Sequence, residues 1–105
     1  MNRKYTIEDV LQDVRTQREL KEGLKTPSLL AVALAEEAGE VCGVVKKHYR
    51  DGTSLQRLED ELSDVLWYLT AFADHIGLTL DDLADYNQKK LHARRAAKEK
   101  ANAGQ

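Results

Sequence analysis

The sequence predicts an all-α protein built as a bundle of four helices, and three observations support this prediction. Apolar residues recur every three or four positions over long stretches, which is the period of a helix. No alternation of apolar and polar residues, the pattern of a strand, extends over six residues. The single proline and the six glycines punctuate the chain at plausible helix ends. With 105 residues, the chain is expected to form a single domain, residues 1–105.

The first two helices are predicted from the signals at their starts. One covers residues 6–23, where Thr6 is a good N-cap and acidic side chains in the first turn favour the helix dipole. The next covers residues 26–50, with Thr26 as its N-cap and Pro27 at the first helical position, where proline is favoured. It ends at the turn sequence RDGT.

The third helix is predicted to begin at Thr53 or Ser54, because Thr53 and Gln56 fit a capping box. It runs to Gly77, a residue type that commonly follows the last turn of a helix. The second and third helices are each about 20 residues, or about 30 Å, long. Because a short turn joins them, they are expected to form a central antiparallel hairpin.

The fourth helix opens at Thr79, with Asp82 three residues later, and continues into a segment rich in alanine and lysine. Residues 96–105, at its end, are expected to fray. A domain of this size buries a limited core, so self-association into an oligomer is also expected.

The composition excludes several classes of protein. The 16 basic and 18 acidic residues give a net charge of −2, without the basic excess typical of nucleic-acid binding. No run of about 18 apolar residues is present, so no membrane span is predicted, and the N-terminus lacks the apolar stretch of a signal peptide. Cys42, the single cysteine, excludes an internal disulfide and a cysteine-based zinc site. A cytoplasmic location fits these features.

Acidic residues interrupt the apolar face of the second helix, in the stretch LLAVALAEEAGEVCGVV. On a helical wheel at about 100° per residue, Glu37 lies inside the apolar stripe and Glu40 lies on its edge. Glu36 lies farther round, on the same side as Glu40. Glu37 and Glu40 therefore occupy neighbouring positions one turn apart. The stripe itself consists of Leu30, Leu34, Val41, Val44 and Val45.

The third helix repeats this arrangement. Glu61 flanks its apolar stripe and Asp64 follows three residues later on the same side, whereas Glu59 and Asp60 point away from it. In an antiparallel hairpin, the pair formed by Glu61 and Asp64 can face the pair on the second helix. The stripe of the third helix consists of Leu58, Leu62, Val65, Leu66, Leu69 and Ile76.

These matched carboxylates have two interpretations. Glutamate is a good helix former, so a stretch rich in it is often a solvated face. Glu37 argues against this, because a lone ionised carboxylate in an apolar seam is costly unless it is paired. A divalent cation would pair it and would relieve the repulsion among four facing carboxylates. Oxygen ligands in this number suit Mg²⁺, with Mn²⁺ as a substitute, whereas Zn²⁺ favours histidine or cysteine.

Two other kinds of site are excluded by their motifs. The chain has no glycine-rich phosphate loop of the type G-x-x-x-x-G-K-[ST]. A di-iron bundle needs a glutamate three residues before a histidine on two helices. Another residue type stands at that distance from each histidine: Val45 before His48, Phe72 before His75, and Lys89 before His92.

The fourth helix carries residues that suit an anionic ligand. Asn87, Lys90 and Arg94 share one face at spacings of three and four. A basic helix end can simply complement the dipole, but Asn87 interrupts an apolar face. Cations beside a carboxylate–metal cluster favour a polyphosphate, whose oxygens bind both Mg²⁺ and the cations. Tyr68, one turn beyond Asp64, can contact the base or sugar of a nucleotide, or can equally be a residue at the edge of the core.

Together these residues resemble the MazG-like, all-α NTP pyrophosphatase superfamily. The signature of that family is Glu-Glu-x-x-Glu on one helix and Glu-x-x-Asp on the next. Here the two parts stand as EEAGE, residues 36–40, and ELSD, residues 61–64. The surrounding LAEEAGEV and DVLWYL are also similar to family sequences, as is a later Asn followed by a Lys and an Arg. The resemblance covers about residues 26–95.

The resemblance implies an enzyme that hydrolyses nucleoside triphosphates, (d)NTP, to the monophosphate and pyrophosphate. It implies a homodimer or homotetramer in which neighbouring subunits complete the pocket, and house-cleaning of the nucleotide pool is one role that it suggests. Family members often carry a base-holding aromatic residue in the first helix, and none can be placed between Asp13 and Leu24. The Mg²⁺ ligands that the resemblance implies are Glu37, Glu40, Glu61 and Asp64.

The predicted chemistry is attack by a metal-activated water on the α-phosphorus of the triphosphate. Glu36, which lies next to the metal ligands, is the candidate base, and Tyr68 is a candidate nucleoside contact. Lys90 and Arg94 would hold phosphates, with Asn87 at the sugar or a phosphate. Two alternatives stay open: a phosphoribosyl-ATP pyrophosphatase, which cleaves the same type of bond, and a non-catalytic helical oligomer that binds nucleotide or metal.

Overall fold

The all-α class is confirmed. The computed structural model describes residues 3–104, which form four α-helices and one short 3-10 helix, and this part of the chain contains no strand. The elements in order are α1 (Ile7–Leu20), η1 (Glu22–Lys25), α2 (Pro27–Asp51), α3 (Leu58–His75) and α4 (Leu80–Ala103).

The first two helices begin where their N-caps predict. Thr6 caps α1 in a capping box, in which its backbone N–H donates to Asp9 Oδ2 at 2.8 Å. Thr26 is the N-cap of α2, and Pro27 occupies its first turn. The predicted end of the first helix was wrong, because α1 stops at Leu20 and the chain tightens into η1 before α2 begins.

The predicted start of the third helix was also wrong. The helix begins at Leu58, and its N-cap, Arg57, makes no side-chain cap. Ser54 Oγ instead accepts a hydrogen bond from the backbone N–H of Gln56 at 3.0 Å, and the carbonyl of Thr53 accepts from His48 Nδ1 at 2.7 Å. These local hydrogen bonds hold residues 52–57 as a turn, because they offer the backbone an alternative to the helix.

Gly77 ends the third helical segment as predicted, and it does so with a positive φ of 80°. Such an angle is unstrained only for glycine, and it redirects the chain sharply. Thr79 then caps α4 in a capping box with Asp82. The helix continues to Ala103, past residue 96, where a frayed tail was expected. The segment consists largely of strong helix formers, which favour its continuation.

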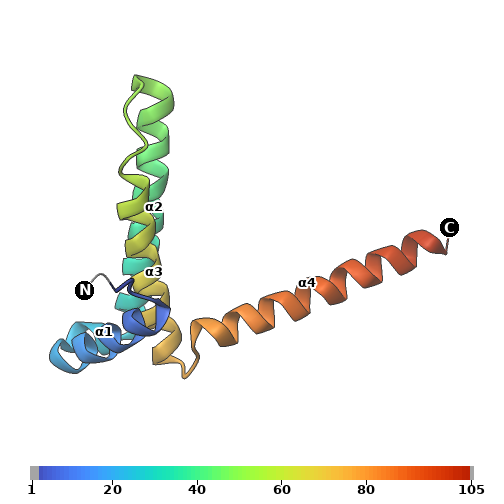
Figure 1. Cartoon of the computed structure of the whole chain (residues 1–105), viewed down its shortest axis with the longest axis horizontal. Coiled ribbons are helices and arrows are strands. Elements are labelled where there is room, and N and C mark those ends of the chain that lie inside the picture. The colour runs from blue at the N-terminus through green and yellow to red at the C-terminus, as the bar shows by residue number, and fades with distance from the viewer. Residues whose placement is uncertain (1–2, 105) are drawn as a thin grey trace.

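The packed part of the molecule is built around α2 and α3. The chain runs along α2 to the turn at residues 52–57 and returns alongside it as α3, while α1 lies against α3 at the other end (Figure 1). Val14, Leu30 and Ala71 form a small fully buried core. Trp67 on α3 packs against this core and donates from Nε1 to Asp13 of α1 at 2.9 Å.

A polar cluster joins α1 to the end of α3 beside this core. Arg18 donates from Nη1 to Asp74 at 2.7 Å and from Nη2 to His75 Nδ1 at 2.7 Å. Arg15 donates to the other oxygen of Asp74 at 3.1 Å. His75 therefore has a structural role. The end of the α2–α3 pair opposite the turn at residues 52–57, which we call its foot, is held by both apolar and ionic contacts.

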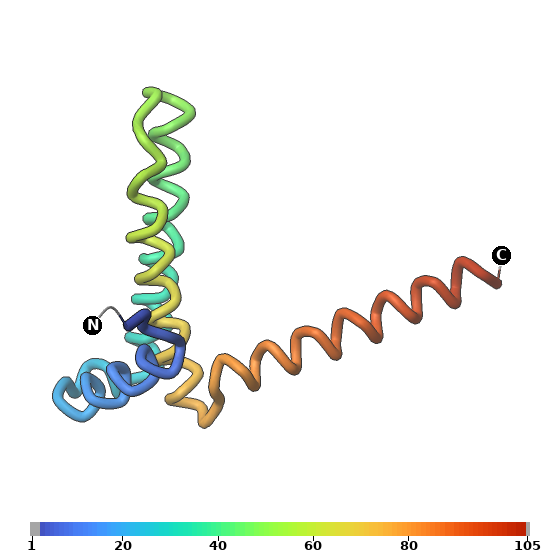
Figure 2. The backbone as a smooth tube through the Cα atoms, viewed as in Figure 1, coloured from blue at the N-terminus to red at the C-terminus, as the bar shows by residue number. Residues whose placement is uncertain are grey.

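The four helices do not form a bundle within the single chain. Figures 1 and 2 show α4 leaving the foot of the α2–α3 pair and extending away, with the C-terminus at its far end. None of its residues is buried. The face that carries Leu83 and Leu91 also carries polar residues, so it offers little apolar surface with which to pack on the other helices.

The shape and surface of the chain reflect this extension. Its radius of gyration is 18.1 Å, whereas a compact domain of this length has about 13 Å. Its accessible surface is 8131 Å², against about 5,900 Å² for a compact monomer of this mass. Three residues expected in the core stripe of the third helix are exposed, namely Leu62, Leu69 and Ile76. Among the described residues, no helix combines the length and apolarity needed to cross a membrane.

Candidate metal and phosphate site

Three carboxylates from the two central helices converge on one point between them. Glu37 comes from α2, and Glu61 and Asp64 come from α3. Each can offer one oxygen such that all three oxygens lie within 4.8 Å of one another. Glu61 is only 3% exposed, and the other two are half-buried. The spacing of three on α3 aims both of its acids at the same point on α2.

Two oxygens of this cluster have no hydrogen-bond partner within the described residues. They are Glu37 Oε2 and Glu61 Oε2, and both are buried. The other oxygen of Glu61 accepts from Arg57 Nη2 at 3.0 Å. A buried carboxylate oxygen without a partner is costly, so the pair fits a cation that binds them both. An all-oxygen donor set fits a hard divalent ion such as Mg²⁺ or Mn²⁺.

Two acids of the cluster, Glu37 and Glu61, have pKa values above those of ordinary carboxyl groups. Burial, followed by the negative charges of Asp64 and Glu61, raises the pKa of Glu37. The nearby carboxyl of Glu40, which can share a proton with Glu61, together with burial and the negative charge of Glu40, raises the pKa of Glu61. Without a cation, a proton is therefore the group that can reduce the repulsion between these acids.

We expect the metal-free protein to lose stability as the pH rises. A carboxyl whose pKa is raised on folding stabilises the protein fully below its ordinary value, here 4.5, and loses this contribution as the pH rises through the raised value. Thermal unfolding in a chelator should therefore show wild type losing stability relative to Glu37→Gln as the pH rises from 4.5. Added Mg²⁺ should restore wild type and not the variant.

The matched control for this experiment is Glu59→Gln, since Glu59 is exposed on α3 and its charge is not among those that raise the pKa of Glu37 or of Glu61. Its unfolding curve should follow that of wild type over the same pH range. If Glu37→Gln and wild type respond identically to both pH and Mg²⁺, the interpretation of this cluster as a strained cation site is incorrect.

The other two predicted acids lie in a groove beside the cluster. Glu36 and Glu40 are both exposed, and both line a groove of about 680 Å³ between α2 and α3. Glu61 contributes to the same groove. Glu40 lies next to Glu61, as the effect on the pKa of that residue indicates, but it is not one of the three acids that converge within 4.8 Å.

Two basic residues of this groove were not singled out in the sequence. Lys47 and Arg57 line it together with the acids. A signal for Arg57 was present, since it stands four residues before Glu61 on the same face. Lys47 follows Glu40 by seven residues, two helical turns, which places both on one side of α2. Both signals depend on knowing that the acids form a site.

Tyr68 lies near the foot of the pair, one turn beyond Asp64 on α3. Its half-buried ring packs against the core and lies edge-on to Trp67, with 5.1 Å between the ring centroids. The placement agrees with the core-edge interpretation, and a nucleoside contact by Tyr68 remains a prediction.

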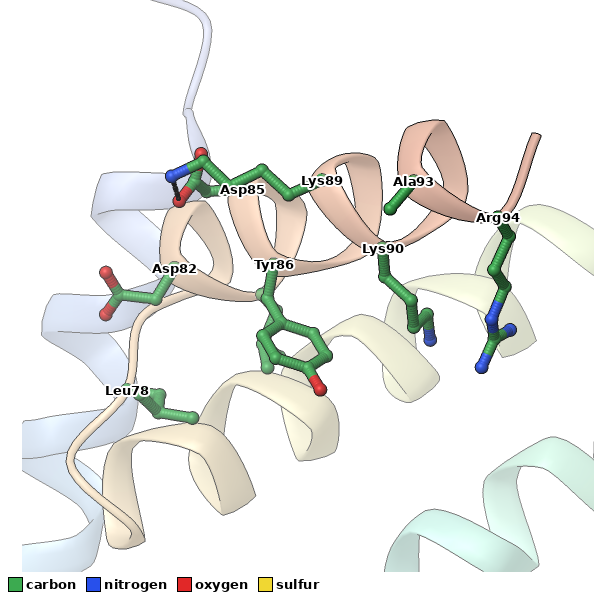
Figure 3. A pocket seen from close by; sticks show the side chains of 9 residues that line it. Leu78, Asp82, Asp85, Tyr86, Lys89, Lys90, Ala93 and Arg94 are labelled. Atoms are coloured by element: carbon green, nitrogen blue, oxygen red, sulfur yellow. Dashed lines mark hydrogen bonds and ion pairs between the residues drawn. The ribbon is translucent and has the colours of Figure 1, made fainter. Parts of the chain in front are cut away.

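The predicted phosphate-binding residues of α4 lie apart from the acids. Lys90 and Arg94 project from one side of this helix, with Tyr86, into a hollow of about 930 Å³ (Figure 3). None of the three clustered acids, Glu37, Glu61 and Asp64, lines this hollow. Asn87 does not line it either, and its Oδ1 accepts from Gln88 Nε2 at 3.2 Å. Within a single chain, the structure therefore does not bring these three residues to the carboxylates.

Comparison with known proteins identifies a family model and two relatives that match this chain. Residues 25–97 match the model of the MazG nucleotide pyrophosphohydrolase domain. The chain is 36% identical over 74 residues to the Gene 37 protein of Mycobacterium phage L5, a match that covers 65% of each protein. It therefore spans just under two thirds of the length of that relative. It is also 27% identical over 95 residues to the uncharacterized protein YpjD of Bacillus subtilis (strain 168), covering 85% of this chain and 86% of that protein.

Proposed function

Because the chain belongs to the MazG nucleotide pyrophosphohydrolase domain family, we propose that it hydrolyses nucleoside triphosphates to the monophosphate and pyrophosphate in a Mg²⁺-dependent reaction. The observation that carries this proposal is the acidic cluster, in which two buried oxygens have no partner among the described residues. A solvated acidic face would leave such oxygens in contact with water. The same arrangement suits a cation that must also accept phosphate oxygens as ligands.

Glu37, Glu61 and Asp64 would hold the metal ion, and Glu40 stands beside them to complete a set of four. When bound, Mg²⁺ lowers the pKa of a coordinated water and screens the negative charge of the phosphates. Glu36 is the proposed base. It is exposed on the wall of the same groove, where its carboxylate is accessible to a water molecule, and it is not one of the three clustered acids.

The proposed reaction is a displacement at the α-phosphorus. The oxygen of water forms a bond to this phosphorus, and the bond from phosphorus to the oxygen bridging the α- and β-phosphates breaks. Pyrophosphate leaves with the electron pair of that bond, and Glu36 takes the proton of the attacking water. The products are a nucleoside monophosphate and pyrophosphate.

The active form that we propose is a homodimer or homotetramer. Lys90 and Arg94 lie apart from the acids within one chain, so α4 of a neighbouring subunit would have to bring them to the site. The excess of accessible surface over that of a compact monomer supports such an assembly. In the assembly, Asn87 and Tyr68 would contact the nucleoside or its phosphates.

A panel of standard and modified NTPs and dNTPs, with pyrophosphate and orthophosphate measured separately, tests the function. We expect pyrophosphate as the inorganic product, in the presence of Mg²⁺ and not of a chelator. Orthophosphate alone would contradict the proposed reaction, and nucleotide binding without turnover would favour a non-catalytic binding protein. Preference for phosphoribosyl-ATP would retain the chemistry and change the substrate. A preference for modified nucleotides would support a house-cleaning role.

A further inference from the structure

The groove between α2 and α3 has opposite charges at its two ends. Glu61, a member of the acidic cluster, lines one end together with Glu40, and Lys47 and Arg57 line the end nearer the turn at residues 52–57. The order of residues requires this polarity. Along α2 the chain passes Glu40 and then Lys47 toward the turn, and along α3 it leaves the turn at Arg57 and then reaches Glu61.

Two glycines form part of the groove wall between these ends. Gly39 and Gly43 line the groove, and both occupy interior positions of α2, although glycines had been expected at helix ends. A glycine inside a helix destabilises it relative to alanine. Neither residue has a positive φ, and no atom lies within 4 Å of the place where a Cβ would stand. Neither backbone geometry nor packing in this chain requires glycine at these two positions. Glycine here is consistent with a groove surface that a ligand approaches closely.

The two cations have unused hydrogen-bonding capacity. Within residues 3–104, Lys47 takes part in no ion pair. Arg57 makes a single hydrogen bond to Glu61, and its side chain is 70% exposed. A guanidinium has five N–H donors in a planar fork, so most of those on Arg57 remain open to an anion in the groove.

We propose that Lys47 and Arg57 bind the β- and γ-phosphates, the part of the substrate that leaves as pyrophosphate. Assignment of this anion as the leaving group rests on the proposed function. A metal-bound triphosphate presents phosphate oxygens to the metal and further charged oxygens beyond it, which need cations. Lys47 lies seven residues from Glu40, or about 10 Å along the helix. Gly43, which lies between them, leaves room for the chain of phosphates.

This placement also sets the direction of the substrate. Tyr68 lies on the opposite side of the metal cluster from Arg57 along α3, toward the core. With Tyr68 as the proposed nucleoside contact, the nucleoside points toward the foot of the α2–α3 pair, and the pyrophosphate points toward the turn. Cations at that end stabilise the negative charge that develops on the leaving group as the bond breaks.

Calorimetric titration of inorganic pyrophosphate into the Mg²⁺-loaded full chain tests the cationic end directly. We expect Lys47→Gln to raise the Kd for pyrophosphate about tenfold. Lys46→Gln is the matched control, since it removes the same charge from an exposed neighbour that does not line the groove. Equal weakening of pyrophosphate binding by the two variants would show a general effect of net charge. Unchanged pyrophosphate binding by Lys47→Gln would show that Lys47 does not contact the anion. Either result overturns the proposal.

Arg57→Gln is titrated first with Mn²⁺ alone, because Arg57 also pairs with Glu61. We expect its Kd for pyrophosphate to rise about tenfold beyond any change in its Kd for the metal. A rise in the metal Kd alone would assign Arg57 to the positioning of Glu61 and would overturn its role as a phosphate ligand.

The Gly43→Ala variant tests whether Gly43 belongs to a surface that contacts the ligand or to an ordinary helix surface. The added methyl group should raise the Tm, because alanine is the better helix former, and should also weaken pyrophosphate binding by obstructing the groove. A raised Tm with unchanged pyrophosphate binding would overturn the role of Gly43, and so would a change in oligomeric state. These binding measurements need no turnover. Failure of wild type to release pyrophosphate from any NTP would overturn the proposed function. The titrations would still show whether the groove binds pyrophosphate.

Discussion

Replacing Asp64 with Asn should lower the rate of pyrophosphate release by about a hundredfold to a thousandfold, the range in which the loss of one electrostatic contact to a transition state commonly falls. Asp64 is one of three acids whose oxygens converge within 4.8 Å. Asparagine keeps the shape of the side chain but supplies a neutral oxygen, so the site loses one of its negative charges. The rate of pyrophosphate release at saturating Mg²⁺ and nucleotide measures the effect on catalysis. Titration with Mn²⁺ should show weaker metal binding in the same variant.

The matched control for this variant is Asp60→Asn. Asp60 lies about one turn earlier on α3, is exposed, and carries the same change of charge without belonging to the cluster. Its turnover and metal binding should stay close to those of wild type. Glu40→Gln should lower turnover in the same direction as Asp64→Asn, because Glu40 stands beside Glu61. A folded Asp64→Asn protein with full turnover would refute the assignment of these acids to the metal.

Replacing Leu69 with Glu should dissociate the proposed oligomer and abolish most of the activity with it. Leu69 is 37% exposed and Ile76 is 57% exposed. Both line an apolar groove of about 460 Å³ with Phe72 and Leu83, between α3, α2 and the start of α4. Burying a leucine contributes about 1.5–3 kcal/mol, and burying an unpaired carboxylate in its place is unfavourable. Since a symmetric interface uses each residue twice, the subunit Kd should rise about a thousandfold or more.

Analytical ultracentrifugation over a range of protein concentrations measures this dissociation. Leu20→Glu is the control, because Leu20 lies at the end of α1, is 73% exposed and is not part of the apolar groove. We expect Leu20→Glu to sediment like wild type and Leu69→Glu to sediment as a monomer with little turnover. A monomeric wild type that is fully active would contradict the proposal that neighbouring subunits complete the site.

Local signals in the sequence located most of the helix ends correctly. Thr6, Thr26 and Thr79 are N-caps, and Gly77 follows α3, because capping depends on hydrogen bonds within three or four residues. The start of α3 failed for a related reason. Ser54 bonds to the backbone of the turn instead of a helix, and the sequence offers both possibilities.

The carboxylate spacing was informative because a helix converts spacing in sequence into direction in space. Glu61 and Asp64 were expected to face the acids of α2, and the structure brings them to Glu37. The helical wheel could not rank the acids by burial, however. Glu40 remains exposed beside the cluster while Glu61 is enclosed, because enclosure depends on which side chains of the facing helix lie above each position.

The sequence by itself determined the all-α class, the main helices and the faces on which their acids lie, since these follow from interactions within a few residues. Only the tertiary structure decided where α4 points and which cations share a groove with the acids. Lys90 and Arg94 were expected there, but Lys47 and Arg57 line that groove within the chain. The physical reason is that a helix packs where it can bury apolar surface. That balance depends on every other helix of the chain, and on neighbouring subunits where the chain alone offers α4 too little apolar surface.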